Sequence, residues 1–226
     1  MPYHHGDLRR SLIDATEALL DERGAEGFSL REVARRAGVS AAAPAHHFGD
    51  AAGLLTAVAT EAFDDLTAAL RAGDARGGRD GQRRMVEQGI EYVGFAMRHP
   101  GRFRLMFRSG LLHEDATLMA SGRAAFAVLE DGVRALRGLR EDAPITGAAW
   151  SALLATWSIV HGFAHLAIAG RFDGLAHSEK LPDRVAYVER WLRPMLAQAL
   201  SGLAGPAVRA SAARRGDRRS TAPRPR

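Results

Sequence analysis

Cysteine is absent from this chain of 226 residues, and lysine occurs once, as Lys180. Without cysteine, neither a disulfide framework nor a thiolate zinc site can form. The polar N-terminus lacks the apolar core of a signal peptide, and no run approaches the roughly 18 apolar residues of a membrane span. The period-two alternation that marks half-buried strands is also missing. We therefore expect an all-α cytoplasmic protein without a membrane partner.

Positive charge is concentrated at one end of the chain. The net charge is +5, but seven arginines and one aspartate give residues 206–226 a charge of +6, so residues 1–205 carry about −1. Residues 1–55, with six arginines and eight acidic residues, carry −2. Total charge therefore does not identify a nucleic-acid site, and the positions of individual side chains must do so.

Apolar residues at helical spacing predict about nine helices, three short ones followed by six longer ones. The first covers about residues 7–23 and ends at Gly24. Asp50 can cap the fourth, which ends near Arg71, and the glycine-rich stretch at 72–81 predicts a flexible break after it. The remaining apolar segments lie near residues 82–98, 101–109, 115–138, 145–170 and 180–204.

The stretch from Ser29 to Phe48 has the pattern of a helix-turn-helix. Ser29 can cap a short helix, with Glu32 three residues later as in a capping box, and Gly38 can close it. Ser40 can then cap a second short helix. The inward apolar positions are Phe28, Leu30, Val33, Ala34, Val39 and Phe48, while Arg31, Arg35 and Arg36 are expected outside. Such a rigid unit places its last helix in the major groove of DNA.

The segment "GAEGFSLREVARRAGVSAAAPAHHFGDAAGLLTAV" resembles the DNA-binding domain of the TetR (tetracycline-repressor) family of transcriptional regulators. The opening "PYHHGDLRRSLIDAT" fits too, so the resemblance covers roughly residues 6–60 closely. The later segment "WSALLATWSIVHGFAHLAIAGRF" is similar to a subgroup named for a Trp-His-Gly motif, here Trp157, His161 and Gly162.

The expected organisation has three parts. A helix-turn-helix DNA-binding head covers residues 1–50, and a larger helical domain for ligand binding and dimerisation covers residues 51–205. Residues 206–226 form a tail rich in Arg, Ser, Ala and Pro without periodicity, which predicts disorder.

The resemblance places the DNA-contacting residues on the helix-turn-helix. Arg31 matches a position that in some members reads a guanine edge, and a bidentate arginine is also the commonest direct contact to guanine. Alanine methyls at the start of the recognition helix can meet thymine methyls. His46 can donate to a base or a phosphate, whereas His47 matches a position that faces phosphate and Phe48 one that faces the core. The predicted DNA-contacting residues are Ser29, Arg31, Ser40, Ala41, Ala42, Ala43, Ala45, His46 and His47.

Two positions depart from the family pattern. Ala45 stands where the family has a tyrosine that contacts phosphate, and Ala51 where it has a lysine that does so. Each lost contact would weaken binding and reduce its salt dependence by about one unit of slope. Pro44 also removes an amide from the third helix and predicts a 3-10 first turn. Two readings stay open: modest DNA affinity assisted by the basic tail, or a degenerate member that binds a ligand or a protein partner without DNA.

Aromatic residues and methionines at helical spacing fill the larger domain, and each alone fits a core position. The resemblance implies that together they surround a small apolar or aromatic effector. The predicted pocket residues are Tyr92, Phe95, Phe103, Phe107, Met119, Phe126, Trp157 and His161. His161 and His165 have metal-ligand spacing, but without a third ligand we expect neither a metal nor a cofactor. An enzyme is the rival interpretation, which no nucleophile–base pair or phosphate-binding glycine loop supports.

The last two long helices are apolar around much of their circumference, which requires partners on two faces. We expect the second set of partners in another subunit, in a two-fold, four-helix interface. The predicted dimer-interface residues are Leu153, Val160, Val188, Trp191 and Leu192. Two heads would bind the half-sites of a near-palindromic double-stranded operator. The sequence thus predicts a homodimeric repressor that its effector releases from DNA, with the fourth helix as the lever.

Overall fold

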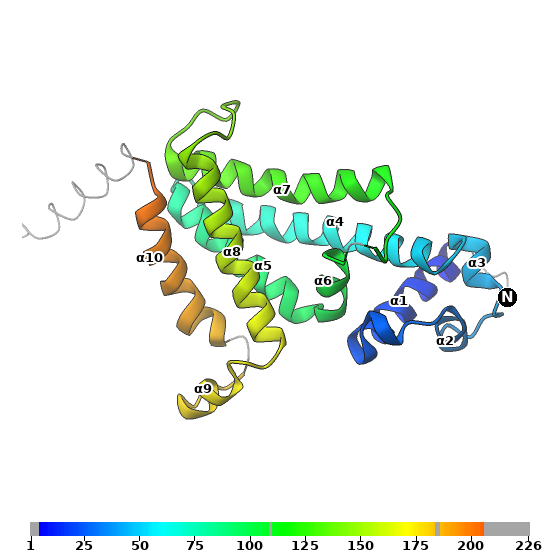
Figure 1. The fold of residues 1–226 in the computed structure, drawn as a ribbon. Coiled ribbons are helices and arrows are strands. Elements are labelled where there is room, and N and C mark those ends of the chain that lie inside the picture. Colours follow the sequence, from blue (N-terminus) through cyan, green and yellow to red (C-terminus); the bar gives the residue numbers. More distant parts are fainter. Residues whose placement is uncertain (1–4, 109, 184–185, 206–226) are drawn as a thin grey trace, which may run out of the picture. The chain divides into compact units, whose positions relative to one another are not determined.

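The computed structural model describes residues 5–108, 110–183 and 186–205, and every element of secondary structure among them is helical (Figure 1). The elements are α1 (His5–Arg23), the 3-10 turn η1 (Ala25–Gly27), α2 (Leu30–Arg36), α3 (Ala43–Phe48), α4 (Ala51–Gly77), α5 (Gly81–Arg98), α6 (Pro100–Met106), α7 (Ala116–Arg137), α8 (Ala148–Ile168), α9 (Asp173–Ser178), the π turn η2 (Val188–Leu192) and α10 (Arg193–Leu203). The predicted all-α fold is confirmed. The predicted disorder of the tail lies outside the described residues.

The described part of the chain contains ten α-helices instead of nine, because the segment after α8 is not one long helix. The short helix α9 is separate, and the π turn η2 comes directly before α10. Pro194 has no amide to donate, so the carbonyl of Arg190 loses its α-helical partner and the turn before the proline widens.

The glycine-rich stretch predicted as a break is instead helical over most of its length. A Cβ on Gly73 would lie 2.7 Å from the carbonyl oxygen of Glu87, and one on Gly77 would lie 2.3 Å from the Cα of Arg84. These glycines therefore let α5 pack closely on the end of α4 instead of loosening the chain. Arg84 reinforces this packing with two hydrogen bonds of 2.8 Å to Asp74.

Contacts divide the molecule into two compact units. The first contains the residues up to Ala68 together with Phe95–Phe126, and the second contains Ala69–Gly94 and the residues from Ala127 onward. The first unit therefore holds α1, α2, α3 and α6 with parts of α4 and α7, and the second holds α8, α9 and α10 with most of α5. The predicted domain boundary after residue 50 stays a prediction.

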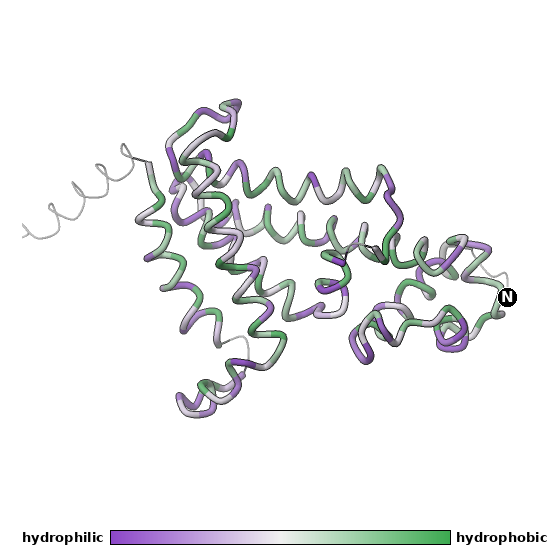
Figure 2. Tube along the Cα trace, in the orientation of Figure 1, coloured by the Kyte–Doolittle hydropathy of each residue, from purple (hydrophilic) through white to green (hydrophobic). Residues whose placement is uncertain are grey.

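The core of the first unit lies where α1, α2 and α4 meet. Leu12, Leu19, Val33, Leu54 and Val58 are fully buried there. Along α1 and α4, hydrophobic positions recur between hydrophilic ones, as an amphipathic helix requires (Figure 2). Four of the predicted inward residues pack against this cluster as partly buried side chains: Phe28, Leu30, Val39 and Phe48.

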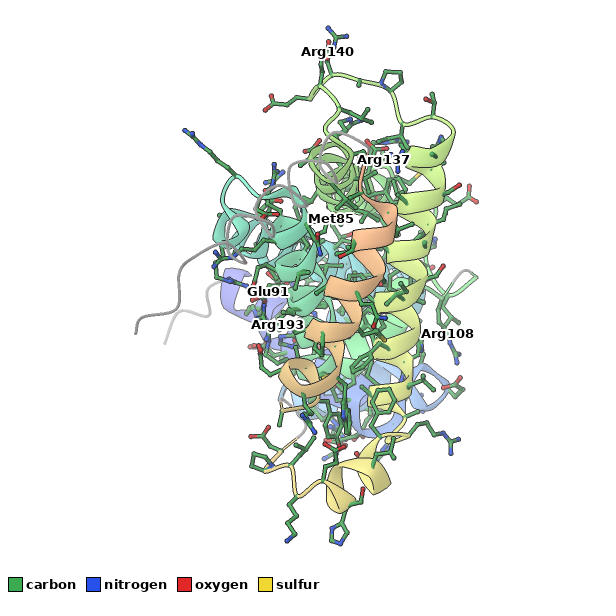
Figure 3. All side chains as sticks on the ribbon, turned by 90° about the vertical axis from the view of Figure 1, so that its left-hand side faces the viewer. Met85, Glu91, Arg108, Arg137, Arg140 and Arg193 are labelled. Atoms are coloured by element: carbon green, nitrogen blue, oxygen red, sulfur yellow. The ribbon has the colours of Figure 1, made fainter. Side chains whose placement is uncertain are left out.

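In the second unit α8 and α10 lie side by side (Figure 1). Polar contacts join α10 to α5: the side-chain amide of Gln82 donates to the carbonyl of Ala197 at 2.8 Å, and Arg193 donates to Glu87 at 2.7 Å. Figure 3 shows Arg193 on α10 and Arg140 on the loop after α7, where the arginine extends away from the helices.

By length and composition, α8 could cross a membrane, with a mean hydropathy of 1.4, although serine, threonine and histidine side chains interrupt its apolar residues. The helix is nevertheless part of a core, because Ala152, Leu153 and Ala164 are fully buried in the second unit. Its opposite face carries exposed apolar side chains such as Leu154 and Leu166. The outer stripe of this core helix therefore combines large apolar side chains with those of Ser151, Ser158 and His165.

Candidate nucleic-acid interface

α2 and α3 form a helix-turn-helix that packs on α1. Val33 and Ala34 of α2 and Pro44 of α3 are buried. Gly38, with φ of +68°, turns the chain after α2, and the next amide, that of Val39, donates to the carbonyl of Ala34 at 3.0 Å. The predicted end of α2 at Gly38 is confirmed, because glycine adopts this left-handed conformation without strain.

The start of α2 follows the prediction only in part. Ser29 is the N-cap, and its carbonyl accepts the amide of Val33 at 3.0 Å, but its side chain makes no capping bond within the described residues. The predicted capping box is wrong, because Glu32 accepts two hydrogen bonds of 2.8 Å from Arg35 and one of 3.0 Å from Arg36. Each guanidinium carries a full positive charge, so it attracts the carboxylate more strongly than a neutral backbone amide does. These hydrogen bonds lower the pKa of Glu32 to about 2.

The three arginines of α2 differ in their partners. Arg36 donates to Glu22 of α1 at 2.8 and 2.6 Å, and only 18% of its side chain is exposed, which corrects its predicted outside position. Arg35 is exposed but paired with Glu32. Arg31 is exposed and has no hydrogen bond or ion pair to a described residue. Arg31 is thus the α2 guanidinium that has no described partner to give up when it binds another molecule.

α3 begins later than the sequence predicts. Ser40 is not its cap; the N-cap is Ala42, and the first helical residue is Ala43. The amide of Ala43 donates to the carbonyl of Ser40 at 3.0 Å, with the three-residue spacing of a 3-10 turn. Pro44 sets this start, because the first turn of a helix is where a missing amide costs nothing.

The outer face of α3 and of the turn before it carries mostly small side chains. Its exposed residues are Ser40, Ala41, Ala42, Ala45 and His46, and Ala43 and His47 beside them are half-buried. The rings of His46 and His47 are 5.5 Å apart and meet edge to face. The structure therefore brings the predicted residues of this helix onto one surface that another molecule can approach closely.

Asp50 caps α4 as predicted, since its Oδ1 accepts the amide of Gly53 at 2.8 Å. The Nε2 of His113 lies 2.9 Å from the same oxygen. The bond from the Gly53 amide and then the one from His113 lower the pKa of Asp50. Sequence reasoning missed His113, which is 63 residues away along the chain and belongs to no local pattern.

Three of the predicted effector-pocket residues meet in the second unit. The hydroxyl of Tyr92 and Nδ1 of His161 are 2.8 Å apart, and the rings of Trp157 and His161 are 6.2 Å apart. Burial raises the pKa of Tyr92. Burial also lowers the pKa of His161, and so does His165, whose ring is 4.5 Å away. Within the described residues, no group of three or more metal-ligating side chains forms around this histidine pair.

The other five predicted pocket residues belong to the first unit. Phe95 and Phe103 are buried there, and Phe126 is half-buried. Phe107 packs edge to face on Phe103 with ring centroids 5.3 Å apart. Met119 lies at the surface, with 64% of it exposed. A pocket that joins these side chains to those of the second unit stays a prediction.

The predicted dimer contacts need correction. Four of them are buried inside a single chain: Leu153, Val160, Val188 and Leu192. Side chains already enclosed by their own chain cannot add to a subunit interface. The fifth, Trp191, is half-buried and stacks on Tyr187 with ring centroids 5.2 Å apart. The apolar side chains that α8 leaves outside are Trp150, Leu154 and Leu166, between 42% and 50% exposed.

Two family models match the chain and together cover more than half of it. Residues 12–58 match a model described as bacterial regulatory proteins of the tetR family. This range includes the whole helix-turn-helix. Residues 85–193 match a model described as the tetracyclin repressor-like C-terminal domain. That description does not mention the Trp-His-Gly subgroup, which stays a prediction.

Individual relatives agree with these models. Over 61 residues the chain is 46% identical to the HTH-type transcriptional regulator BetI of Burkholderia thailandensis, a match that covers 27% of this chain and 31% of that regulator. The structure of a protein of unknown function from Rhodococcus sp. RHA1 is 32% identical, with a TM-score of 0.70, over 90% of this chain and 99% of that one. The TetR family transcriptional regulator PfmR of Thermus thermophilus has the same fold at 18% identity, with a TM-score of 0.62, over 83% of this chain and 97% of that one.

Proposed function

The chain belongs to the TetR family of bacterial transcriptional regulators, and from this premise we propose that it is a homodimeric DNA-binding repressor released by a small apolar or aromatic effector. The match to the BetI regulator spans only about a third of that protein, so the activity of the whole chain is part of the proposal. The alternative of a member that has lost DNA binding is not favoured, because the match to the tetR family model includes the whole helix-turn-helix.

One observation carries the DNA-binding part of the proposal. The helix-turn-helix leaves Arg31 without a partner among the described residues while Arg35 and Arg36 are paired, and it leaves the face of α3 bare. In our proposal Arg31 reads guanine through its two parallel donors. The methyl groups of Ala41 and Ala42 meet thymine methyls in the same groove.

The dimer is proposed to form through the outer stripe of α8 instead of the buried residues that the sequence suggested. On its exposed face α8 carries Trp150, Leu154 and Leu166 among Ser151, Ser158 and His165, and α10 exposes Met195. A second copy of this chain related by a two-fold axis would cover that face and would present two heads to a near-palindromic operator. Residues 1–50 then serve as the DNA-binding domain and residues 51–205 as the effector-binding and dimerisation domain.

The effector is proposed to bind beside the aromatic residues of the larger domain. Tyr92 and His161 offer a polar contact next to the indole of Trp157, which suits a mainly apolar ligand with one polar group. Release of DNA requires that the effector bind the two arrangements of the heads with different affinity, typically by about 1–3 kcal/mol.

The experiment that tests DNA binding is selection of bound fragments from random duplexes with the full chain, repeated with Arg31→Ala and Arg35→Ala. Both variants lose one charge from α2, but of the two arginines only Arg35 has a partner among the residues that the structure describes. We expect Arg31→Ala to relax one guanine position in each half-site, at a cost of about 1–3 kcal/mol. Arg35→Ala should keep the selected sequence. Recovery of the same sequence with Arg31→Ala would show that this residue is not a reader.

A further inference from the structure

The loop between α6 and α7 packs on the DNA-binding head, within the same unit. Leu111 and Leu112 of this loop lie against the hydrophobic cluster formed by α1, α2 and α4. Gly110, with φ of 90°, turns the chain toward that cluster. Asp115 ends the loop as the cap of α7, where its carboxylate accepts the amide of Thr117 at 2.7 Å. The loop is therefore fixed at both ends.

His113 attaches the middle of this loop to the first turns of α4. Its amide donates to the hydroxyl of Thr56 at 2.8 Å, and its Nε2 lies 2.9 Å from the Oδ1 of Asp50. Both members of the imidazole–carboxylate pair are reachable from outside, because 54% of the His113 side chain and 61% of the Asp50 side chain are exposed.

This pair lies next to the recognition helix. α3 ends at Phe48, and Asp50 follows two residues later, so the two Cα atoms are within about 8 Å of each other. A recognition helix in the major groove has phosphates on both sides, because the groove is only about 12 Å wide. We therefore expect the DNA backbone to pass close to the imidazole of His113 when α3 enters the groove.

The charges around His113 fit a phosphate contact only when the imidazole carries its proton. Asp50 faces it from α4, and Asp115 acts on it from its own loop. An uncompensated carboxylate at Asp50 would repel a phosphate. The neighbouring outer residues of α3 and α4, Ala45 and Ala51, supply no charge. A protonated His113 offsets the charge of Asp50, while Glu114 and Asp115 on the same loop keep their own negative charges.

We propose that His113 is part of the DNA interface, that it contacts the phosphate backbone as an imidazolium, and that operator binding therefore takes up a proton. The inference rests on the proposed DNA binding and adds to it a contact from outside the helix-turn-helix. Histidine is the side chain that gains its proton between about pH 5 and 8, so the operator affinity rises as the pH falls through that range.

The experiment compares His113→Gln with the native full chain on a duplex selected by the native chain, at about pH 6 and about pH 8. Glutamine can still donate to Asp50 but carries no charge. If each contact takes up one proton, the affinity of the native chain rises by up to about tenfold per pH unit and per protomer as the pH falls, and His113→Gln loses that gain. The slope of affinity against salt falls by about one per protomer in this variant at low pH.

Three further variants separate this role from others. His113→Lys carries a permanent charge, so it binds at about pH 8 as tightly as the native chain does at about pH 6. His46→Gln measures the part of the pH dependence that comes from α3 itself. His177→Gln, at an exposed position on α9, leaves both the pH dependence and the salt slope unchanged.

A purely structural role for His113 gives a different result. In that case His113→Gln, which keeps the bond to Asp50, has the pH dependence and salt slope of the native chain, and the inference is overturned while the proposed function stands. A native chain that binds no duplex at either pH overturns the proposed function as well.

Discussion

The outer face of α3 and the outer face of α8 both expose side chains that the described chain does not cover, but their chemistry is opposite. Around α3 the exposed groups are the methyls of three alanines, the imidazole of His46 and, on α2, the guanidinium of Arg31, which has no partner among the described residues. On α8 they are the large apolar side chains of Trp150, Leu154 and Leu166. A polar, charged partner suits the first face, and a second copy of an apolar face suits the second. On this contrast we base the proposal that DNA is the partner of α3 and that a second copy of the chain is the partner of α8.

The largest expected effect comes from the buried side of α8. Leu153 is fully buried, so Leu153→Ala should lower the free energy of unfolding by about 2–5 kcal/mol through the cavity that it leaves. Its neighbour Leu154 is 50% exposed, and Leu154→Ala leaves no cavity within one chain. Urea denaturation at several protein concentrations separates the two, because loss of a dimer contact depends on concentration. Equal, concentration-independent losses would contradict the assignment of the two faces.

The next largest effect is expected when charges are placed on the outer stripe of α8. The double variant Leu154→Glu with Leu166→Glu puts charges on the proposed dimer face, so the protein should become monomeric and lose about 100-fold in operator affinity, since the two heads no longer bind together. Light scattering gives the mass, and anisotropy gives the affinity. The control is Leu175→Glu on α9, where the leucine is 59% exposed but lies off this stripe. A dimer that survives the double variant rules this face out.

A smaller effect is expected at the border of the two sides of α8, where His161 lies. Burial lowers the pKa of His161 and of His99, so the unfolded chain binds these protons more readily than the folded one. Stability should therefore fall as the pH drops from about 7 through the ordinary histidine pKa of about 6.5. We expect a melting temperature lower by a few degrees at about pH 5. His161→Gln should reduce this decrease in melting temperature to the part that His99 causes. An unchanged decrease would contradict the role of His161.

The smallest effect tests whether the small side chains of α3 limit the affinity for DNA. Ala45 is exposed, so Ala45→Tyr adds a side chain that can reach a phosphate without disturbing the core. We expect a severalfold gain in operator affinity and a salt slope steeper by up to about one per protomer. Salt titration of operator binding measures both. A loss of affinity would mean that the methyl of Ala45 lies against the bases.

Local patterns predicted the head well. Gly38 and Asp50 act at the positions that the sequence indicates, because a left-handed turn and a helix cap depend on a few neighbouring residues. The prediction of a capping box is wrong because the carboxylate of Glu32 binds arginines instead. One of them, Arg36, also binds Glu22 on another helix. The pair of Asp50 with His113 could not be predicted either, since only the fold brings it together.

Periodicity was less informative for α8 and for the end of α4. An apolar helix with two apolar sides gives no sign of which side its own chain covers, so Leu153 was assigned outward although it is buried. The glycines at 73 and 77 looked like a break in the helix, but they serve as contact points for α5. In both cases the deciding partner is distant in the sequence.

Native mass spectrometry of the full chain with its selected duplex tests the central claim most directly, because it requires both faces at once. The account predicts a complex of two chains on one duplex, and one chain or none per duplex when the outer stripe of α8 carries the two glutamates. A native chain that stays monomeric on DNA, or forms no complex with any duplex at low salt, would contradict it.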